Sequence, residues 1–386
     1  MSFTDRAFIA GVFEHPTRKA PDKSLAQLHA EVAAGALADA GLTLDDVDGY
    51  FVAGDNTNLY PLSLVEYLGL KLKVIGATDT GGSAYLTHIG QAMDAIAAGR
   101  CSVALITLAG RPRTGGAAAD PAPDWALPDV PFEHPYGRAV INTYAMCATR
   151  HMYEYGTTSE QLAWIKVAAS HHAQHNPNAM LKNVVTVEDV VNSPMIADPL
   201  HRLDCCVVSD GGGAIVVVSP EVAKSLSRPM IRIRGVGDGV KHQDGGQIDL
   251  TYSATRFSAA DAYERAGVKP SDIKYASLYD SFTITVLEQI EDLGFCEKGK
   301  GGAFVADGNL ISGVGKLPIN TDGGGLCNNH PANRGGMTKI IEAVRQLRGE
   351  THAAVQVANC DLALANATGG WLGTRHAAST VILERL

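Results

Sequence analysis

An internal repeat constrains the fold of this chain more than any other feature of its sequence. Residues 36–48 read ALADAGLTLDDVD and residues 262–274 read AYERAGVKPSDIK, with alanine, glycine and aspartate in matching places. Each copy reads as the end of a helix that leads through a short turn into a strand. Two copies of one such unit predict a chain built from duplicated halves, in which helices cover the sheets. We therefore expect an α/β protein.

The unit that follows also recurs. In the first copy, a glycine turn at 80–82 leads into a helix and then into a strand at 101–108. In the second copy, a glycine turn at 322–324 leads into a helix, and we predict the matching strand at 353–358. Glycine turns at strand-to-helix junctions place ligands beside helix N-termini. Extra residues between the second turn and its helix carry His330.

Length and composition set the domain organisation. The 386 residues fit two domains or one large duplicated unit. A strand pattern begins again at Pro229, so we predict an N-terminal half over 1–228 and a C-terminal half over 229–386. A segment at about 110–203 begins rich in Pro, Gly and Ala and continues with helical patterns. We predict that it is an insertion that lies over the core.

The charge pattern excludes several classes of partner. Hydrophobic residues make up 46% and charged residues 19% of the chain, as in an ordinary globular protein. The net charge is −9 and no basic block is present, so a nucleic acid is not an expected partner. No apolar run is as long as a membrane span, and the first residues lack the pattern of a secretory leader. Seven cysteines without a C-x-x-C pair fit the reduced thiols of a cytoplasmic protein.

The stretch 320–336, NTDGGGLCNNHPANRGG, is the clearest candidate for a site. Three consecutive glycines allow a tight turn and a close approach to a ligand. His330 precedes Pro331, which disfavours the helical region for the histidine and places it on an ordered loop. A helical pattern follows after Gly336. The stretch is therefore either an active-site corner or a tight turn with a hydrogen-bonded histidine.

Several motifs spread over the chain resemble the thiolase superfamily, and within it the thiolases of the sterol-carrier-protein type. They are YGTTSE at 155–160, LDCCVVSDGGGA at 203–214, LYDSF at 278–282, GFCEKG at 294–299, NHP at 329–331 and RQLRG at 345–349. The resemblance covers nearly the whole chain. It implies a duplicated α-β-α-β-α fold of five layers, an inserted loop domain over the site and a homodimer.

The nucleophilic cysteine of thiolases is missing. Such a cysteine stands at the N-terminus of the buried helix, where the helix dipole lowers the pKa of the thiol. Counting back from Ala95, Ile96 and Gly99, which match the family's A-I-x-x-G, that position is Gly82. Ser83 is the nearest hydroxyl, either as a nucleophile or as the N-cap of the helix. The second cysteine of thiolases, in a C-x-G motif, is missing too.

What remains resembles the cysteine-less branch of thiolase-like aldolases that cleave steroid side-chain CoA thioesters. That branch has glycine in place of the nucleophile and an L-Y-D-x-F motif, which here gives Tyr279 and Asp280. The family's G-H-P histidine, which helps hold a thioester oxygen, corresponds to His330. The aldolases have a second tyrosine where this chain has His330.

The resemblance implies a retro-aldol cleavage of a β-hydroxyacyl-CoA thioester. Tyr279 would act as base or donor at the β-hydroxyl, and His330 would donate to the thioester oxygen or protonate the enolate. Backbone N–H groups near Gly369 and Gly370 would add an oxyanion hole. Asp280 would orient Tyr279 or cap a helix. Two alternatives stay open: an acyltransferase, with Ser83 as nucleophile or with non-covalent transfer, and a lipid or acyl-CoA carrier without catalysis.

The implied partners follow from the same resemblance. Relatives often work with a small zinc-ribbon and OB-fold protein that binds the CoA end, so a separate partner is expected. Arg111, Arg113 and Arg138 are candidates for contacts with CoA phosphates, or else are solvated surface residues. The acyl-CoA is the substrate, and no cofactor is expected beside it.

A histidine cluster on one predicted helix gives a weaker signal. His171, His172 and His175 have helical spacings that suit a metal ion. No acidic or third ligand is evident in the sequence, so we expect no metal.

Overall fold

The computed structural model describes residues 6–53, 60–115, 126, 130–137, 139–242, 244–331 and 335–386. The strands of the first half are β1 (Phe8–Glu14), β2 (Gly49–Val52), β3 (Val74–Gly76), β4 (Val103–Gly110) and β7 (Gly211–Val218). They lie in the order β3-β2-β4-β7-β1. β2 is parallel to β3 and β4, whereas β7 is antiparallel to β4 and β1.

The second half repeats this arrangement. Its strands are β8 (Ile231–Val240), β9 (Tyr275–Leu278), β10 (Leu362–Trp371) and β11 (Thr374–Arg385), in the order β8-β11-β10-β9. β10 is parallel to β9 and antiparallel to β11, and β11 is antiparallel to β8. A parallel bridge between Ala276 and Ile319 stands where β3 stands in the first half. The duplication predicted from the sequence is confirmed.

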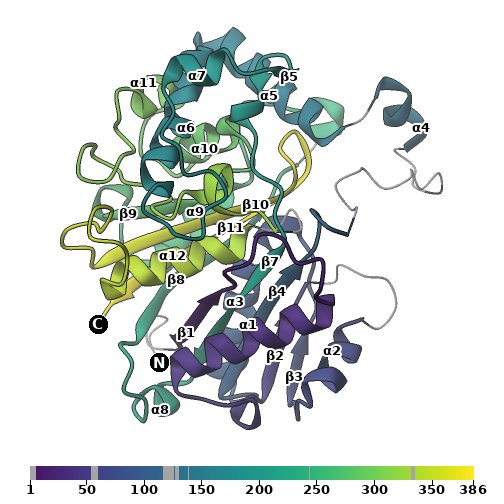
Figure 1. Cartoon of the computed structure of the whole chain (residues 1–386), viewed down its shortest axis with the longest axis vertical. Helices are drawn as coiled ribbons and strands as arrows, with labels where there is room; N and C mark the ends of the chain where they lie inside the picture. Colours follow the sequence, from purple (N-terminus) through teal and green to yellow (C-terminus); the bar gives the residue numbers. More distant parts are fainter. Residues whose placement is uncertain are drawn as a thin grey trace.

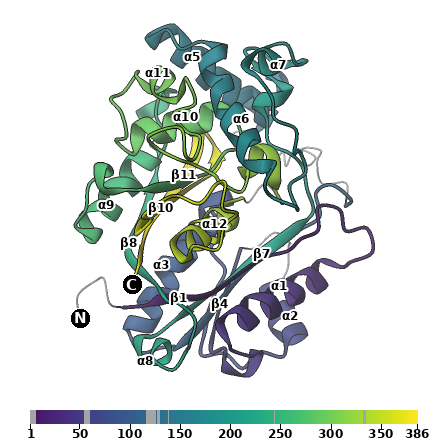
Figure 2. The same cartoon turned by 60° about the vertical axis from the view of Figure 1, so that its left-hand side comes forward.

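The two halves meet along β1 and β8, which pair antiparallel through Phe8 with Arg232 and Ile9 with Ile231. This pairing joins the strands into one sheet of nine strands. α3 (Ala84–Ala97) and α12 (Gly336–Arg348) pack on strands of both halves and on each other (Figures 1 and 2). They therefore form the central layer of the molecule.

Outer helices cover the two remaining faces. α1 (Leu25–Ala40) and α2 (Tyr60–Leu68) lie on the first half, and α9 (Thr255–Ala266) and α10 (Thr283–Asp292) on the second. The strands are apolar on both faces: Val103 and Leu105 of β4 join the cluster under α1, while Ala104 and Ile106 join the central cluster. This gives the predicted α-β-α-β-α order of layers. Within the described ranges, no helix is long and apolar enough to cross a bilayer.

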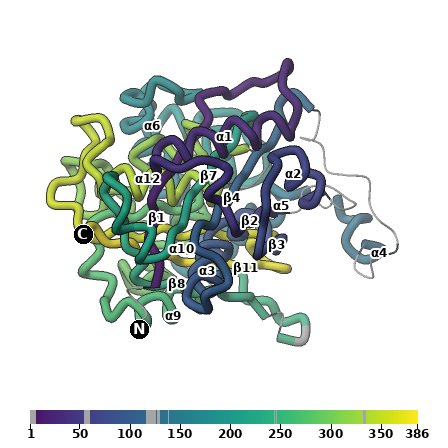
Figure 3. The backbone as a smooth tube through the Cα atoms, turned by 90° about the horizontal axis from the view of Figure 1, so that it is seen from below, coloured from purple at the N-terminus to yellow at the C-terminus, as the bar shows by residue number. Residues whose placement is uncertain are grey.

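The predicted insertion forms a helical cap beside α10. It contains α4 (Val130–Glu133), α5 (Val140–Tyr155), α6 (Ser159–Ala173), α7 (Val187–Val191), β5 (Met195–Ala197) and β6 (Leu200–His201). α5 and α6 share an apolar cluster with α10, and α6 also contacts α11 (Gly301–Val305). α4 lies at the periphery (Figures 1 and 3), and its Glu133 pairs with Arg375 at 2.6 Å. The short helix α8 (Pro220–Ala223) leads from β7 toward the second half.

One predicted strand is wrong. Residues 353–358 form turns, and the strand that matches β4 is β10 (Leu362–Trp371). The side chain of Gln346 accepts a hydrogen bond from the backbone N–H of Val357 at 2.9 Å, and Gln356 donates to the backbone carbonyl of Gln346 at 3.0 Å. These bonds tie the segment to the end of α12, so its backbone does not pair with a strand. Ser24 caps α1, since its hydroxyl oxygen accepts from the backbone N–H of Gln27 at 3.0 Å.

A buried arginine at the end of α12 links the halves. The side chain of Arg348 is 0% exposed and pairs with Asp39 of α1 at 2.8 Å. It also donates to the carbonyl oxygens of Ala10 at 2.8 Å and Pro229 at 3.1 Å. Asp39 in turn pairs with Arg228 at 2.6 Å, and the Arg228 side chain is 34% exposed.

Arg348→Met is expected to lower the free energy of unfolding by about 2–4 kcal/mol, because it leaves the buried carbonyl oxygens of Ala10 and Pro229 without this donor and removes one partner of Asp39, which keeps Arg228. Urea denaturation followed by tryptophan fluorescence measures the loss. Arg228→Met is the matched control on the same carboxylate, and we expect about 1 kcal/mol or less there because the pair is partly exposed. Equal losses in both variants would contradict the role of Arg348.

Candidate active site

A cavity of about 290 Å³ lies where the ends of β9 and β10 meet the turn before α3. The turn contributes Gly81 and Gly82 to the lining, and α5 of the insertion contributes Tyr144. The lining residues are Gly81, Gly82, Val140, Tyr144, Cys206, Tyr279, Ser281, Phe282, His330, Thr368, Gly369, Gly370 and Trp371. The repeated strand-to-helix junctions thus converge on one site, as the sequence predicted.

Two side chains with acid–base chemistry touch inside this cavity. The phenol oxygen of Tyr279 lies 2.9 Å from Nε2 of His330, and the two rings meet edge to face. Tyr279 follows β9 directly, and its backbone N–H donates to the carbonyl of Asn366 in β10 at 3.0 Å. The backbone N–H of His330 donates to Ser209 Oγ at 2.9 Å. Both backbones are therefore fixed, and the hydrogen bond joins groups that are 51 residues apart.

Burial keeps both groups neutral. It raises the pKa of Tyr279 well above its ordinary value, and the nearby Tyr144 adds to that shift. A hydrogen bond with the backbone of Gly335, at the start of α12, acts in the opposite direction on the pKa of the phenol. Burial lowers the pKa of His330 to about 4. A neutral phenol thus faces a neutral imidazole at pH 7, and this pair can exchange a proton.

Asp280 anchors the loop that carries His330. Its Oδ1 pairs with Nζ of Lys339 at 2.6 Å, and both side chains are buried. The same carboxylate accepts from the backbone N–H groups of Gly325 at 2.8 Å and Leu326 at 3.1 Å. Asp280 does not cap α10, because the N-cap is Phe282, so that alternative is wrong. Its negative charge does raise the pKa of His330, against the larger effect of burial.

Gly82 stands at the N-terminus of the buried helix, where a side chain would have no room. A Cβ atom there would lie 2.6 Å from Cε2 and 2.7 Å from Cζ of Tyr279, and it would also clash with the carbonyl of Thr368. The phenol ring therefore fills the volume that a side chain at position 82 would need. A nucleophile at position 82 and this position of Tyr279 exclude each other.

Ser83 does not line the cavity. Its side chain is buried and donates to the carbonyl of Thr80 at 2.9 Å, with the hydroxyl of Thr80 at 3.0 Å. Ser83 is the N-cap residue of α3, as one alternative predicted, but its side chain makes no capping hydrogen bond with that helix. Within the described residues, no base is bonded to Ser83 Oγ, as a nucleophilic serine requires.

The glycines at the end of β10 do reach the cavity. Gly370 has a φ of 75°, which an L side chain rarely adopts. A Cβ atom on Gly369 would clash with the carbonyl of Thr80. Glycine at both positions thus lets the β10 backbone approach the turn before α3. Their role as donors to an oxyanion stays a prediction.

The arginines predicted to meet CoA phosphates lie elsewhere. Arg111 donates to the carbonyl of Pro21 at 3.4 Å, and Arg113 is exposed, with Nη1 3.6 Å from the sulfur of Met180. Neither lines the cavity around Tyr279. Arg138 lies outside the described residues. Contacts of these residues with the CoA end stay a prediction.

Two functional candidates were missed by the sequence reasoning. Tyr144 of α5 enters the cavity with its ring 4.4 Å from that of Phe282 and its hydroxyl 3.3 Å from the carbonyl oxygen of Gly370. Cys206 lines the same cavity. Tyr144 comes from a segment without a motif, so only the packing of the insertion could reveal it, whereas Cys206 belongs to the motif at 203–214, which does not by itself give the cysteine a role. Burial raises the pKa of Cys206 to about 12, so the group stays a thiol.

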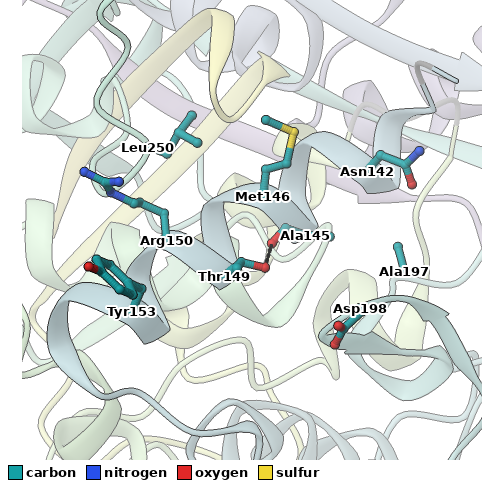
Figure 4. A pocket seen from close by; sticks show the side chains of 9 residues that line it. All are labelled: Asn142, Ala145, Met146, Thr149, Arg150, Tyr153, Ala197, Asp198 and Leu250. Atoms are coloured by element: carbon teal, nitrogen blue, oxygen red, sulfur yellow. Dashed lines mark hydrogen bonds between the residues drawn. The ribbon is translucent and has the colours of Figure 1, made fainter. Parts of the chain in front are cut away.

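A larger hollow of about 680 Å³ lies on another face of α5 (Figure 4). Met146, Arg150 and Tyr153 project from the helix along it, and Leu250 and Asp198 face them across the hollow (Figure 4). Arg150 pairs with Glu154 at 2.6 Å. This hollow has no acid–base pair comparable to Tyr279 and His330, so we assign the chemistry to the smaller cavity.

His171 and His172 lie in the last turn of α6, and His175 follows the helix in a turn. His172 Nε2 accepts from the backbone N–H of Ser312 at 2.9 Å, and His175 stacks on His352 with ring centroids 4.8 Å apart. In the part of the chain that the structure describes, no three His, Cys, Asp or Glu side chains are grouped as metal ligands.

Comparisons with known proteins agree with this geometry. Residues 237–385 match a family described as thiolase C-terminal domain-like. The chain is 37% identical to a steroid side-chain-cleaving aldolase of Thermomonospora curvata, over 89% of this chain and 90% of that protein. It is 33% identical to an acetyl-CoA acetyltransferase of Methanothermobacter thermautotrophicus, over 92% and 93%. A solved structure described as an Ltp2-ChsH2(DUF35) aldolase has a TM-score of 0.88 and 36% identity, and covers 100% of this chain and 98% of that chain.

The raised pKa of Cys206 generates a prediction about the reactivity of the cavity. At pH 7.5 the folded protein is expected to react with iodoacetamide at Cys206 on the order of 10³-fold more slowly than a free cysteine, because the thiolate is nearly absent. Peptide mass spectrometry after timed alkylation measures the rate. The urea-unfolded protein is the control and should react at the ordinary rate. Rapid alkylation of Cys206 in the folded protein would contradict the prediction.

Proposed function

Because this chain belongs to the thiolase superfamily, in its sterol-carrier-protein-thiolase-like branch, we propose that it is a C–C lyase that cleaves a β-hydroxyacyl-CoA thioester by a retro-aldol reaction. The products are a ketone or aldehyde and a shortened acyl-CoA. The relative from Thermomonospora curvata, described as a steroid side-chain-cleaving aldolase, supports this reaction and makes a steroid side chain one candidate for the acyl group.

One observation carries the proposal. The ring of Tyr279 occupies the volume that a side chain at position 82 would need, and its hydroxyl contacts His330 at 2.9 Å. Where thiolases have a covalent nucleophile, this site therefore has the acid–base pair of Tyr279 and His330. A retro-aldol cleavage needs such a pair and no acyl-enzyme, whereas the usual thiolase reaction needs the nucleophile.

The first step removes the proton of the β-hydroxyl. The phenol oxygen of Tyr279 accepts this proton while its own proton passes to Nε2 of His330. The lowered pKa of His330 ensures that the imidazole is neutral and can accept at pH 7. The negative charge of Asp280 stabilises the imidazolium, and the ammonium of the paired Lys339 offsets part of this effect. General base catalysis of this kind contributes roughly 10²–10⁴-fold to the rate.

The second step breaks the bond between Cα and Cβ. The β-carbon becomes a carbonyl, and the electron pair of the bond passes to the thioester as an enolate. Gly369 and Gly370 bring the backbone of β10 close to the N-terminus of the buried helix, where N–H groups can meet the enolate oxygen. Protonation of Cα then gives the shortened acyl-CoA.

One relative supports the acyltransferase alternative, but the geometry of the site supports it less than it supports the lyase. The similarity to an acetyl-CoA acetyltransferase keeps thiolase-type transfer as a second candidate. Ser83 lies outside the cavity lining, and Cys206 is held as a thiol by its raised pKa. Either residue would be a weak nucleophile without an adjacent base. Neither a non-covalent acyl transfer nor a carrier role would require the hydrogen-bonded pair of Tyr279 and His330.

The proposal also covers the partner protein, the oligomeric state and the cellular location. One similar structure is described by a name that joins two components, Ltp2 and ChsH2, and this supports a separate partner protein for the present chain. We expect this partner to be a small zinc-ribbon and OB-fold protein at the CoA end. A homodimer and a cytoplasmic location are the expectations from the sequence.

A product panel tests the reaction. Purified protein is incubated with β-hydroxyacyl-CoA thioesters that carry steroid, aromatic and short alkyl groups, with and without the partner protein, and the products are identified by mass spectrometry. We expect a ketone or aldehyde and a shortened acyl-CoA in equal amounts. Tyr279→Phe is expected to lower the rate by about 10²–10⁴-fold, since it removes the hydroxyl that accepts the proton.

The matched control is Tyr263→Phe, because Tyr263 donates its hydroxyl to the carbonyl of Leu293 on the outer side of the second half. This variant should keep the activity of the wild type. Full lyase activity in Tyr279→Phe would contradict the assignment of the base. Acyl exchange without cleavage would favour the acyltransferase.

The lowered pKa of His330 predicts the shape of the pH profile. A base with a pKa of about 4 stays neutral as the pH falls from 8 to 5.5, so kcat/KM should stay within about twofold over that range. An ordinary histidine of pKa about 6.5 would leave only about a tenth of the enzyme active at pH 5.5. Circular dichroism at each pH checks that the protein stays folded. A loss of activity centred near pH 6.5 would contradict the role of His330.

A further inference from the structure

Among the described residues of the insertion, Tyr144 is the one side chain with acid–base chemistry in the cavity lining. It projects from the middle of α5 (Val140–Tyr155) and is buried. Its hydroxyl donates to the carbonyl of Gly370 at 3.3 Å, and while burial raises the pKa of this phenol, the nearby side chain of Ser281 lowers it. Both partners line the same cavity as Tyr279. The Tyr144 hydroxyl therefore lies at the edge of the reaction space.

The mechanism needs a second proton donor. The pair of Tyr279 and His330 takes the proton of the β-hydroxyl before the C–C bond breaks, so it lies beside the oxygen of Cβ. Cα must then receive a proton from a group on another side of the substrate. The Tyr144 phenol comes from the insertion, whereas Tyr279 comes from the end of β9, so the two hydroxyls enter the cavity from different elements. They lie close enough that Tyr144 raises the pKa of Tyr279.

We propose that Tyr144 is a catalytic residue, the acid that delivers a proton to Cα of the enolate. This assignment rests on the proposed retro-aldol function. In the free enzyme the Tyr144 hydroxyl donates its hydrogen bond to the carbonyl oxygen of Gly370. At 3.3 Å this hydrogen bond is long, so it costs little free energy to exchange it for a bond to the substrate. Ser281 stabilises the phenolate that forms, because a hydrogen bond from its side chain lowers the pKa of Tyr144 against the effect of burial.

The protons balance over one turnover. The β-hydroxyl proton passes to Tyr279 as the proton of Tyr279 passes to His330, and the Tyr144 proton passes to Cα as the enolate carbon forms its new C–H bond. Solvent then returns a proton to the Tyr144 phenolate and removes one from the His330 imidazolium. No oxidant, reductant or covalent intermediate is needed.

Deuterium exchange isolates this step from the cleavage. An acid that protonates Cα in one direction removes a proton from Cα in the other, so the enzyme should introduce deuterium from D₂O into propionyl-CoA or acetyl-CoA alone. We expect Tyr144→Phe to lower this exchange by about 10²-fold and kcat for cleavage by a similar factor, with KM within about threefold. Tyr279→Phe should keep exchange within about threefold of the wild type while it loses cleavage. Mass spectrometry of the thioester measures the exchange.

A stability measurement and two further variants accompany this test. Tyr144→Phe keeps the ring against Phe282, and thermal unfolding checks that the fold is retained. Tyr153→Phe changes an exposed tyrosine of the same helix, which is 83% exposed, and should leave both rates unchanged. Ser281→Ala removes the hydroxyl beside Tyr144 and should lower the exchange by about tenfold.

Each outcome decides the assignment. Exchange that persists in Tyr144→Phe while cleavage falls would make Tyr144 a support for the Gly370 turn and would overturn the proposal. Absence of exchange in a wild-type preparation that cleaves its substrate would also overturn it. Exchange that depends on Tyr144, together with no cleavage of any β-hydroxyacyl-CoA, would uphold Tyr144 as the acid at Cα and reject the lyase function.

Discussion

The carboxylate of Asp280 is the contact on which the geometry of the site depends. It receives the ammonium of Lys339 from α12 and the backbone N–H groups of Gly325 and Leu326 from the glycine turn. The residue itself follows Tyr279 at the end of β9. One buried charge therefore ties the strand that carries the phenol to the loop that carries His330. A buried ion pair costs desolvation energy, and it is maintained here with three donors around the acceptor.

Because Gly82 has no side chain, the site supports a different reaction from that of a thiolase. In the thiolases that the chain resembles, a cysteine stands at this position, at the N-terminus of the buried helix. Here the aromatic ring of Tyr279 fills the volume, and the phenol meets an imidazole that burial holds neutral. The same fold thus carries out acid–base catalysis on Cβ and Cα instead of attack on the thioester carbonyl.

Much of this arrangement could be predicted from the sequence, because it depends on patterns that recur along the chain. The repeat at 36–48 and 262–274 predicted the duplicated halves, and the YDSF and NHP motifs predicted that Tyr279 and His330 are the reacting pair; the structure brings them to 2.9 Å. The prediction of a strand at 353–358 was wrong because the side chain of Gln346 in α12 binds the backbone of that segment and holds it outside the sheet.

The contribution of the insertion could not be predicted. Tyr144 reaches the cavity only through the packing of α5 on the second half, and no local pattern records that packing. The contact of Asp280 with Lys339 spans 59 residues and likewise has no local signal. Motifs thus predicted the residues whose types the chemistry requires, whereas the residues that surround and position them came from the tertiary structure alone.

The central claim is that the C–C bond is cleaved without a covalent bond between the substrate and the protein. Its most direct test is acid quenching during turnover of a β-hydroxyacyl-CoA with a radiolabelled acyl chain, followed by mass and radioactivity measurements on the intact protein. The account predicts that shortened acyl-CoA accumulates while the protein keeps its unmodified mass and carries no label. An acyl adduct that forms and decays at the rate of turnover, on Cys206, Ser83 or any other residue, would contradict it.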